Sequence, residues 1–121
     1  MTTNTEDLRT RWEAYAAIWK LEGAEAKRSA CAAHLDTACV YTDPLTQRTG
    51  HDALIEYMLE FHQQVPGGHF VTQSFKAHNG RSVAVWNMVG GDGTVLGDGI
   101  SYGEYTEDGT LKTMTGFFDQ G

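Results

Sequence analysis

The sequence feature most suggestive of chemistry is an aspartate at the end of a short alternating segment. Asp43 is followed directly by Pro44, which cannot continue a strand. A carboxylate half-buried among aromatic side chains such as Trp19, Tyr41 and Trp86 can act as a general base. An Asp-Pro pair also begins turns, in which the carboxylate accepts hydrogen bonds from nearby backbone N–H groups. The residues alone therefore leave a catalytic and a structural role open for Asp43.

Histidine and cysteine side chains give weaker signals. None of the five histidines stands in an HxH or HExxH spacing, so no metal site is expected. His62, on a predicted helix, is the candidate for a second acid or base beside Asp43. Cys31 and Cys39 form no CxxC motif, and we expect both to be reduced core residues.

Composition limits the class of protein. A chain of 121 residues with 40% hydrophobic and 21% charged residues is typical of one globular domain, here residues 1–121. The net charge of -7 is spread along the chain, which argues against nucleic acid or an anionic membrane surface as a partner. No apolar run approaches the roughly 20 residues that span a bilayer, and the first thirty residues are not signal-like, so we expect a cytoplasmic protein.

Hydrophobic periodicity predicts the elements that position Asp43. Apolar residues at helical spacing indicate three helices, and alternation after the third helix indicates four strands joined by short turns. The predicted helices span 6–21, 24–36 and 51–65, the predicted strands span 39–42, 69–77, 82–89, 94–106 and 111–118, and residues 45–50 are assigned to a polar loop. The order ααβαββββ favours an α+β fold with a mostly antiparallel sheet.

These elements, with three short segments, resemble the nuclear transport factor 2-like superfamily. The segments are Tyr41-Thr42-Asp43-Pro44, Gly50-His51-Asp52 and Gly109-Thr110-Leu111, and the resemblance covers residues 6–120. It is strongest to SnoaL-like proteins and ketosteroid isomerases. The resemblance implies three helices packed in the concave face of a strongly curved sheet, a cone-shaped α+β barrel. It also implies a homodimer formed through the outer face of the sheet, and no cofactor is expected.

The resemblance also assigns roles to individual residues. In the ketosteroid isomerases the matching aspartate is the general base, and Asp43 falls on it. A tyrosine of the first helix donates to the developing oxyanion in that family; Tyr15 is the nearest match, with Trp19 as the alternative register. The position of the second oxyanion donor, an aspartic acid in the family, is occupied here by Ser101. Two supporting tyrosines of the family fall near Leu35 and Met58, which cannot donate hydrogen bonds.

By the family register, the glycine face of the strand 94–106 lines the hollow. Ser101 then points inward, while Asp98 alternates to the opposite face, toward solvent or a dimer contact. We expect an apolar small-molecule pocket walled by aromatic and other apolar residues: Trp19, Tyr41, Tyr57, Phe61, Ala84, Trp86, Met88, Met114 and Phe118. The outward-facing residues of the sheet suit a partly polar contact between two copies: Asn87, Tyr102, Glu104, Thr113 and Thr115.

Two hypotheses about function follow. In the first, the protein is an isomerase-, cyclase- or lyase-type enzyme in which Asp43 removes a proton beside a carbonyl of a hydrophobic substrate, with Tyr15 and Ser101 at the oxyanion. In the second, the same fold is a ligand-binding or dimeric interaction module without chemistry, because the family's second acid and supporting tyrosines are missing.

Overall fold

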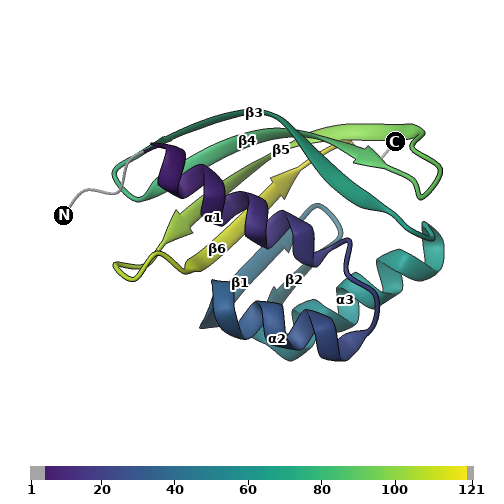
Figure 1. Cartoon of the computed structure of the whole chain (residues 1–121), viewed down its shortest axis with the longest axis horizontal. Helices are drawn as coiled ribbons and strands as arrows, with labels where there is room; N and C mark the ends of the chain where they lie inside the picture. The colour runs from purple at the N-terminus through teal and green to yellow at the C-terminus, as the bar shows by residue number, and fades with distance from the viewer. Residues whose placement is uncertain (1–4, 120–121) are drawn as a thin grey trace.

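The computed structural model of the chain describes residues 5–119 and contains three helices and six strands in an α+β arrangement (Figure 1). In chain order the elements are α1 (Thr5–Ile18), α2 (Ala24–His34), β1 (Leu35–Asp43), β2 (Thr46–Thr49), α3 (His51–Gln64), β3 (His69–His78), β4 (Arg81–Val89), β5 (Val95–Tyr105) and β6 (Leu111–Phe117). The predicted order is confirmed, with one added strand. No helix in this part of the chain is long and apolar enough to cross a membrane.

The added strand, β2, corrects the assignment of residues 45–50 to a loop. It pairs antiparallel with the end of β1, from Val40 opposite Thr49 to Asp43 opposite Thr46. Its four residues are all polar, so no apolar alternation marks it in the sequence. The first predicted strand is also longer than expected, because it begins at Leu35 rather than Cys39, and α2 ends correspondingly earlier, at His34.

The six strands form one sheet in the order β2-β1-β6-β5-β4-β3. Neighbouring strands run antiparallel except for β1 and β6, which run parallel and bring distant parts of the chain together. The β3–β4 hairpin turns at Asn79 and Gly80, both with positive φ, as the Asn-Gly pair predicts.

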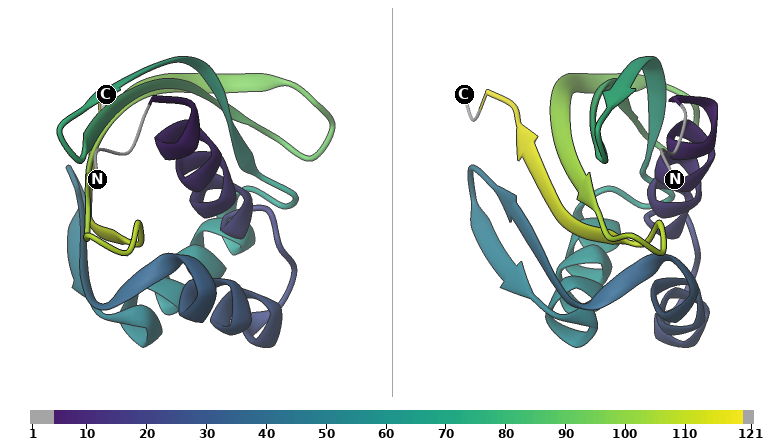
Figure 2. Two further views of the ribbon diagram at one scale, coloured as in Figure 1. Left: turned by 60° about the vertical axis from the view of Figure 1, so that its left-hand side comes forward. Right: turned by 90° about the vertical axis from the view of Figure 1, so that its left-hand side faces the viewer.

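The sheet curves strongly around α1, while α2 and α3 pack on each other and on β1 at the other end of the molecule (Figure 2). Glycine permits close packing on the concave face of β5. At Gly99 a Cβ atom would overlap the indole ring of Trp86 and lie 2.8 Å from the carbonyl oxygen of Phe117. The ring of Trp86 therefore lies against the backbone of β5, where any side chain would displace it.

Helix α1 buries the apolar stripe that its spacing predicts. Leu8, Trp12, Tyr15 and Trp19 are all at most 4% exposed. The last turn is closed by Lys27 of α2, a fully buried lysine whose ammonium donates to the carbonyl oxygens of Ile18 and Trp19 at 2.9 and 3.3 Å. The carbonyl of Ile18 also accepts a hydrogen bond from the backbone N–H of Leu21 at 3.2 Å, and the ammonium of Lys27 adds a charged donor that stabilises the end of α1.

Candidate functional site

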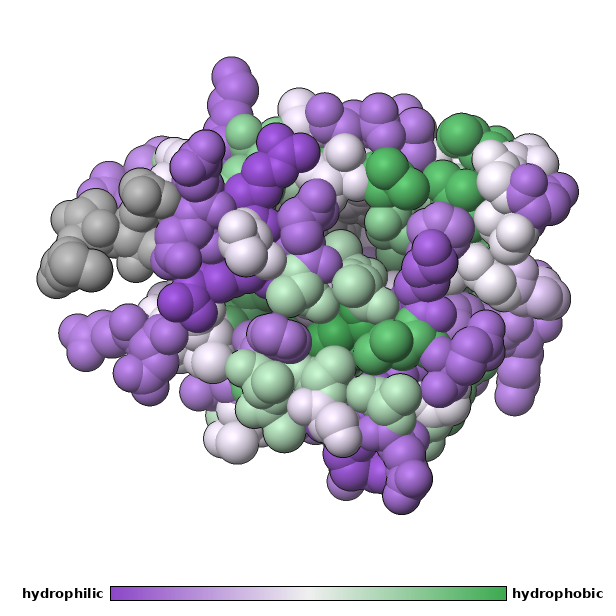
Figure 3. All heavy atoms as spheres, in the orientation of Figure 1, coloured by the Kyte–Doolittle hydropathy of each residue, from purple (hydrophilic) through white to green (hydrophobic). Residues whose placement is uncertain are grey.

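A cavity of about 550 Å³ lies between the concave face of the sheet and helices α1 and α3. Its walls combine aromatic rings from both helices with residues of β1, β3, β4 and β5, and acidic residues also border it. Its volume falls within the range of roughly 300–1,000 Å³ that is usual for small-molecule sites. On the face shown in Figure 3, apolar residues gather at the centre and over the loop end of β4 and β5, with polar residues around them.

Asp43 lies on the cavity wall at the end of β1, and it is only 8% exposed. Its Oδ1 accepts hydrogen bonds from the backbone N–H groups of Leu45 and Thr46, at 2.8 and 3.1 Å. Its Oδ2 accepts hydrogen bonds from the hydroxyls of Tyr41 and Tyr57, both at 2.7 Å. Four donors match the roughly four acceptor sites of an ionised carboxylate, so the turn geometry and a tyrosine pair together hold Asp43 in place.

The two tyrosines reach Asp43 from different elements. Tyr41 precedes Asp43 by two residues and shares its face of β1, whereas Tyr57 comes from α3 and carries Arg48 over its ring at 5.0 Å. Burial, and next the hydrogen bond to Asp43, raise the pKa of Tyr57; burial is also the main cause that raises the pKa of Tyr41. Both phenols therefore remain protonated donors at neutral pH.

Tyr15 offers a different hydrogen-bonding arrangement. The indole N–H of Trp19, one residue beyond the end of α1, donates to the Tyr15 hydroxyl at 3.1 Å. Within residues 5–119 no acceptor takes the hydroxyl's own proton, and the side chain lines the cavity. Burial raises the pKa of Tyr15, and the nearby charge of Asp43 contributes to the same shift. Tyr15 is thus a neutral donor beside the carboxylate.

Ser101 on β5 repeats this arrangement. The indole N–H of Trp86 donates to its Oγ at 2.9 Å, and the serine proton has no acceptor in the described part of the chain. Gly116 separates Ser101 from Asp43: a Cβ atom at this glycine would lie 3.6 Å from Ser101 Oγ and 3.8 Å from Asp43 Cβ. The hydroxyl of Ser101 and the carboxylate of Asp43 therefore border the same part of the cavity.

Aromatic rings form a connected wall beside these polar groups. Trp19 contacts Phe61 and Phe70 with centroid distances of 5.6 and 5.3 Å, and Phe70 contacts Trp86 at 5.0 Å. These edge-to-face contacts hold both indoles in fixed orientations, and each indole N–H is already directed at a hydroxyl. The wall therefore offers an apolar surface to a ligand, while Tyr15 and Ser101 offer the unused protons.

Most of the residues that the sequence predicts for the site line the cavity. Its lining includes Asp43, Tyr15, Ser101, Trp19, Tyr41, Tyr57, Phe61, Trp86, Met88 and Phe118. Ala84 and Met114 are not in the lining, because they lie almost fully buried in the core. His62 does not line the cavity either; its ring nitrogen Nε2 lies 3.1 Å from the carbonyl oxygen of Gly68. Asp98 is exposed and borders the cavity, at its rim.

Sequence reasoning missed several contributors to the site. Phe70 and Thr72, on the same face of β3, line the cavity but are absent from the predicted pocket wall; their alternation along the strand is the signal that could have found them. The hydrogen bonds from Tyr41 and Tyr57 to Asp43 were also missed. The family register places the supporting tyrosines near Leu35 and Met58, and Tyr57 stands immediately beside the second of these positions.

No cluster of metal-ligating side chains occurs in the described part of the chain: no three histidine, cysteine, aspartate or glutamate residues group together there. Cys31 and Cys39 are free and fully buried, and burial raises the pKa of the Cys31 thiol to about 11. Neither thiol lines the cavity, so the polar chemistry of the site belongs to carboxylate and hydroxyl groups.

Comparison with known proteins identifies relatives of this arrangement. The sequence profile of the SnoaL-like domain matches residues 12–114. No protein of curated function matches the sequence. Among solved structures, a candidate isomerase of the SnoaL-like family from Agrobacterium tumefaciens is 23% identical, with a TM-score of 0.86, covering 94% of this chain and 98% of that chain.

Two further solved structures share the fold at lower identity. A candidate ketosteroid isomerase from Kribbella flavida is 19% identical, with a TM-score of 0.73 over 98% of this chain and 82% of that chain. A candidate SnoaL-like polyketide cyclase from Jannaschia is 12% identical, with a TM-score of 0.76 over 95% of this chain and 87% of that chain. At these identities the likeness establishes the fold alone.

Proposed function

The chain belongs to the SnoaL-like domain family, and from this premise we propose that it is an isomerase- or cyclase-type enzyme acting on a hydrophobic carbonyl compound. In this proposal the cavity holds the substrate with its carbonyl oxygen at the hydroxyls of Tyr15 and Ser101. Asp43 then removes a proton from the carbon beside the carbonyl. The same carboxylate returns the proton to another carbon. Alternatively, the carbanion attacks a second carbonyl carbon of the same molecule; the C=O π electrons move to that oxygen, which takes the proton from Asp43 as the ring closes.

The observation that carries this proposal is the pair of hydroxyls with unused protons. Each hydroxyl accepts a hydrogen bond from an indole N–H, which leaves its own proton to be donated into the cavity. As a proton leaves the substrate, negative charge develops on the carbonyl oxygen, and donors already in place stabilise it without reorganisation. Loss of one such donor costs about 10²–10³ in kcat in enzymes that rely on it.

Asp43 can accept a proton from the substrate if one of its four hydrogen-bond donors is displaced. The two backbone donors belong to the turn after β1, and Tyr41 is 9% exposed, so these three are held firmly. Tyr57 is only half-buried and stands on α3 at the cavity wall. A substrate that displaces the Tyr57 hydroxyl would free one lone pair of Asp43 Oδ2 for the proton. Positioned bases of this kind contribute about 10²–10⁴ in rate.

The test is exchange of the protons beside the carbonyl. Enolisable aryl ketones and polyketide-like diketones are incubated in D₂O, and loss of the proton signal is followed by nuclear magnetic resonance. We expect Asp43→Asn to abolish catalysed exchange while ligand binding is retained. Asp98→Asn is the matched control, since it removes an exposed carboxylate that also borders the cavity. Equal exchange by the wild type and Asp43→Asn refutes the role of Asp43 as base.

A second function, ligand binding without chemistry, is favoured by the saturation of Asp43. A carboxylate that accepts four hydrogen bonds is well suited to join β1, the following turn and α3 as a structural element. This alternative predicts that apolar ligands raise the melting temperature of the protein while no ketone in the panel exchanges protons. Measured exchange above the uncatalysed rate excludes it.

We also propose that two copies of the chain associate through the outer face of the sheet. Val85, Ile100 and Phe117 are paired neighbours on β4, β5 and β6 and are 36%, 45% and 59% exposed. A contiguous apolar strip of this kind is typical of a contact surface, and the family resemblance favours a second copy as its partner. Light scattering tests this: Ile100→Glu should give monomers, whereas Ala17→Glu, exposed on α1, should leave a dimer. A monomeric wild type overturns the proposal.

A further inference from the structure

The lining of the cavity contains acidic side chains and no basic side chain. Its lining includes four acidic residues, the buried Asp43 and the exposed Glu60, Asp98 and Asp119. None of the nine lysine and arginine side chains and none of the five histidines is part of that lining. All fourteen of these basic residues lie within residues 5–119, so the imbalance is a property of the described cavity.

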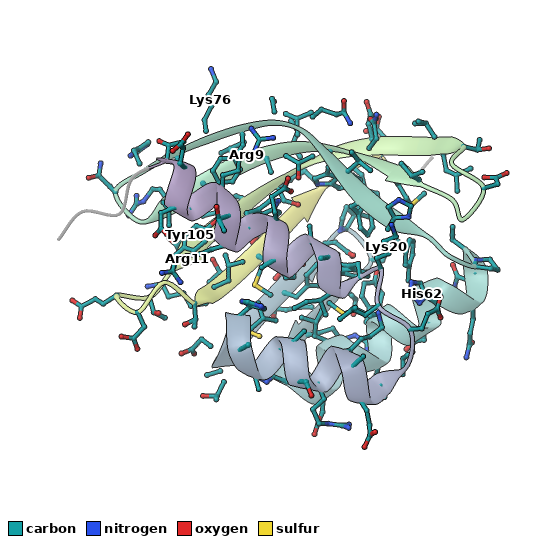
Figure 4. All side chains as sticks on the ribbon, viewed as in Figure 1. Arg9, Arg11, Lys20, His62, Lys76 and Tyr105 are labelled. Atoms are coloured by element: carbon teal, nitrogen blue, oxygen red, sulfur yellow. The ribbon has the colours of Figure 1, made fainter. Side chains whose placement is uncertain are left out.

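Cations elsewhere in the molecule do not supply the missing positive charge. Arg48 lies over the ring of Tyr57 and pairs with Glu56 and Glu60 at 3.4 and 3.6 Å. Lys27 is fully buried but donates to the carbonyl oxygens at the end of α1. Lys76 points away from the molecule on the outer side of β3 (Figure 4). A negatively charged ligand group would therefore find no free cation on the walls.

The polar groups that do face the cavity are neutral. Tyr15 and Ser101 each offer one hydroxyl proton, and burial keeps the Tyr15 phenol protonated. Two neutral donors are sufficient for a carbonyl oxygen, which has two lone pairs. They do not balance the loss of hydration of a full carboxylate, which requires a cation or several donors when it leaves water.

We infer that the cavity selects its ligand by charge: it binds an uncharged, apolar carbonyl compound and rejects the same skeleton carrying a carboxylate. This inference rests on the proposed function only in placing the carbonyl oxygen at Tyr15 and Ser101. The carboxylate of Asp43 repels an anion at short range, and in a partly dehydrated site this repulsion is only weakly screened by salt. A ligand with an ammonium group encounters attraction from the same carboxylates.

The experiment compares three probes that share one ring system. Naphthalen-2-yl methyl ketone, 2-naphthoate and naphthalen-2-ylmethylammonium are titrated into the wild-type protein at pH 8, and binding is measured by calorimetry. We expect the ketone to bind about tenfold or more tightly than the carboxylate, and the ammonium compound to bind at least as tightly as the carboxylate. Asp43→Asn should narrow the gap between ketone and carboxylate. If that variant does not fold, Asp98→Asn tests the same narrowing at the exposed rim.

The outcomes separate this inference from the proposed reaction. Carboxylate binding equal to or tighter than ketone binding overturns the inference, whatever the result of the proton-exchange assay. Ketone binding with the expected preference but without proton exchange supports charge selection and removes the proposed reaction. Failure of the ketone to bind at millimolar concentration overturns both, because each requires a neutral carbonyl compound in the cavity.

Discussion

Replacing Tyr41 by phenylalanine deletes one hydroxyl and leaves the ring between Trp19 and Tyr57 in place. In the wild-type protein this hydroxyl donates to Asp43 Oδ2 at 2.7 Å, and Tyr41 is only 9% exposed. A hydrogen bond to a charged group contributes about 1.5–3 kcal/mol, because the ionised partner is costly to leave unsatisfied. Water reaches this position poorly. We therefore expect Tyr41→Phe to lower the free energy of unfolding by about 1.5–3 kcal/mol.

Tyr57→Phe is the matched control. It removes a donor to the same oxygen at the same distance of 2.7 Å, but Tyr57 is half-buried rather than buried. Water can replace its hydroxyl, so the expected loss is smaller, about 0.5–1.5 kcal/mol. In an Asp43→Asn background the charge is absent, and the difference between the two tyrosine substitutions should shrink.

Urea unfolding followed by tryptophan fluorescence measures these free energies. Each variant is studied at two protein concentrations, because association of the folded chains would make the transition concentration-dependent. The reasoning is refuted if Tyr41→Phe is neutral, or if Tyr57→Phe costs as much as Tyr41→Phe. Either result would mean that the burial of the Tyr41 hydroxyl has no energetic consequence for the carboxylate.

Two further predictions concern positions away from the carboxylate. Gly99→Ala should cost about 1–3 kcal/mol and weaken ligand binding, because the added methyl group displaces the ring of Trp86. Gly97→Ala, on the same strand face, should change stability little, because a Cβ atom there would lie 3.9 Å from its nearest neighbour, Met88 Cε. Equal melting temperatures for the two variants would contradict this prediction. Burial lowers the pKa of Lys27 from its ordinary value of 10.5. Between the two values the unfolded chain binds a proton that the folded chain has released, so Lys27 adds stability as the pH rises toward 10.5. Urea unfolding at pH 7 and 10 should show the wild type gaining stability relative to Lys27→Met; an unchanged difference would count against the prediction.

Hairpins and helix faces could be predicted from the sequence because their signals are local. The Asn79-Gly80 turn and the stripe from Leu8 to Trp19 each depend on residues a few positions apart, and both are confirmed. The strand β2 could not be predicted, since its pairing with β1 uses backbone groups and its side chains are all polar. Its stability comes from the partner strand, which no window of the sequence reveals.

Part of the candidate site could also be predicted, because some of its signals are local in the sequence. The position of Asp43 before Pro44 indicates it as a candidate site residue, and Tyr41, two residues earlier, shares its face of the strand. Tyr57 follows Asp43 by fourteen residues in the sequence and lies on α3. Its hydrogen bond to the carboxylate therefore depends on how α3 packs against β1. Ala84 is predicted to wall the pocket but lies in the core, because the curvature of the sheet decides which part of the inner strand face borders the cavity.

The parallel pairing of β1 with β6 has a consequence for synthesis on the ribosome. Leu35 lies opposite Leu111 and Thr42 lies opposite Thr115, so the strand that ends in Asp43 has no inner neighbour until nearly the whole described chain has emerged. Contacts of such sequence separation form late, because a long loop must first close. A nascent chain halted before β6 therefore exposes one long edge of β1 and has no finished cavity. Ligand binding can therefore begin only once β6 has paired with β1.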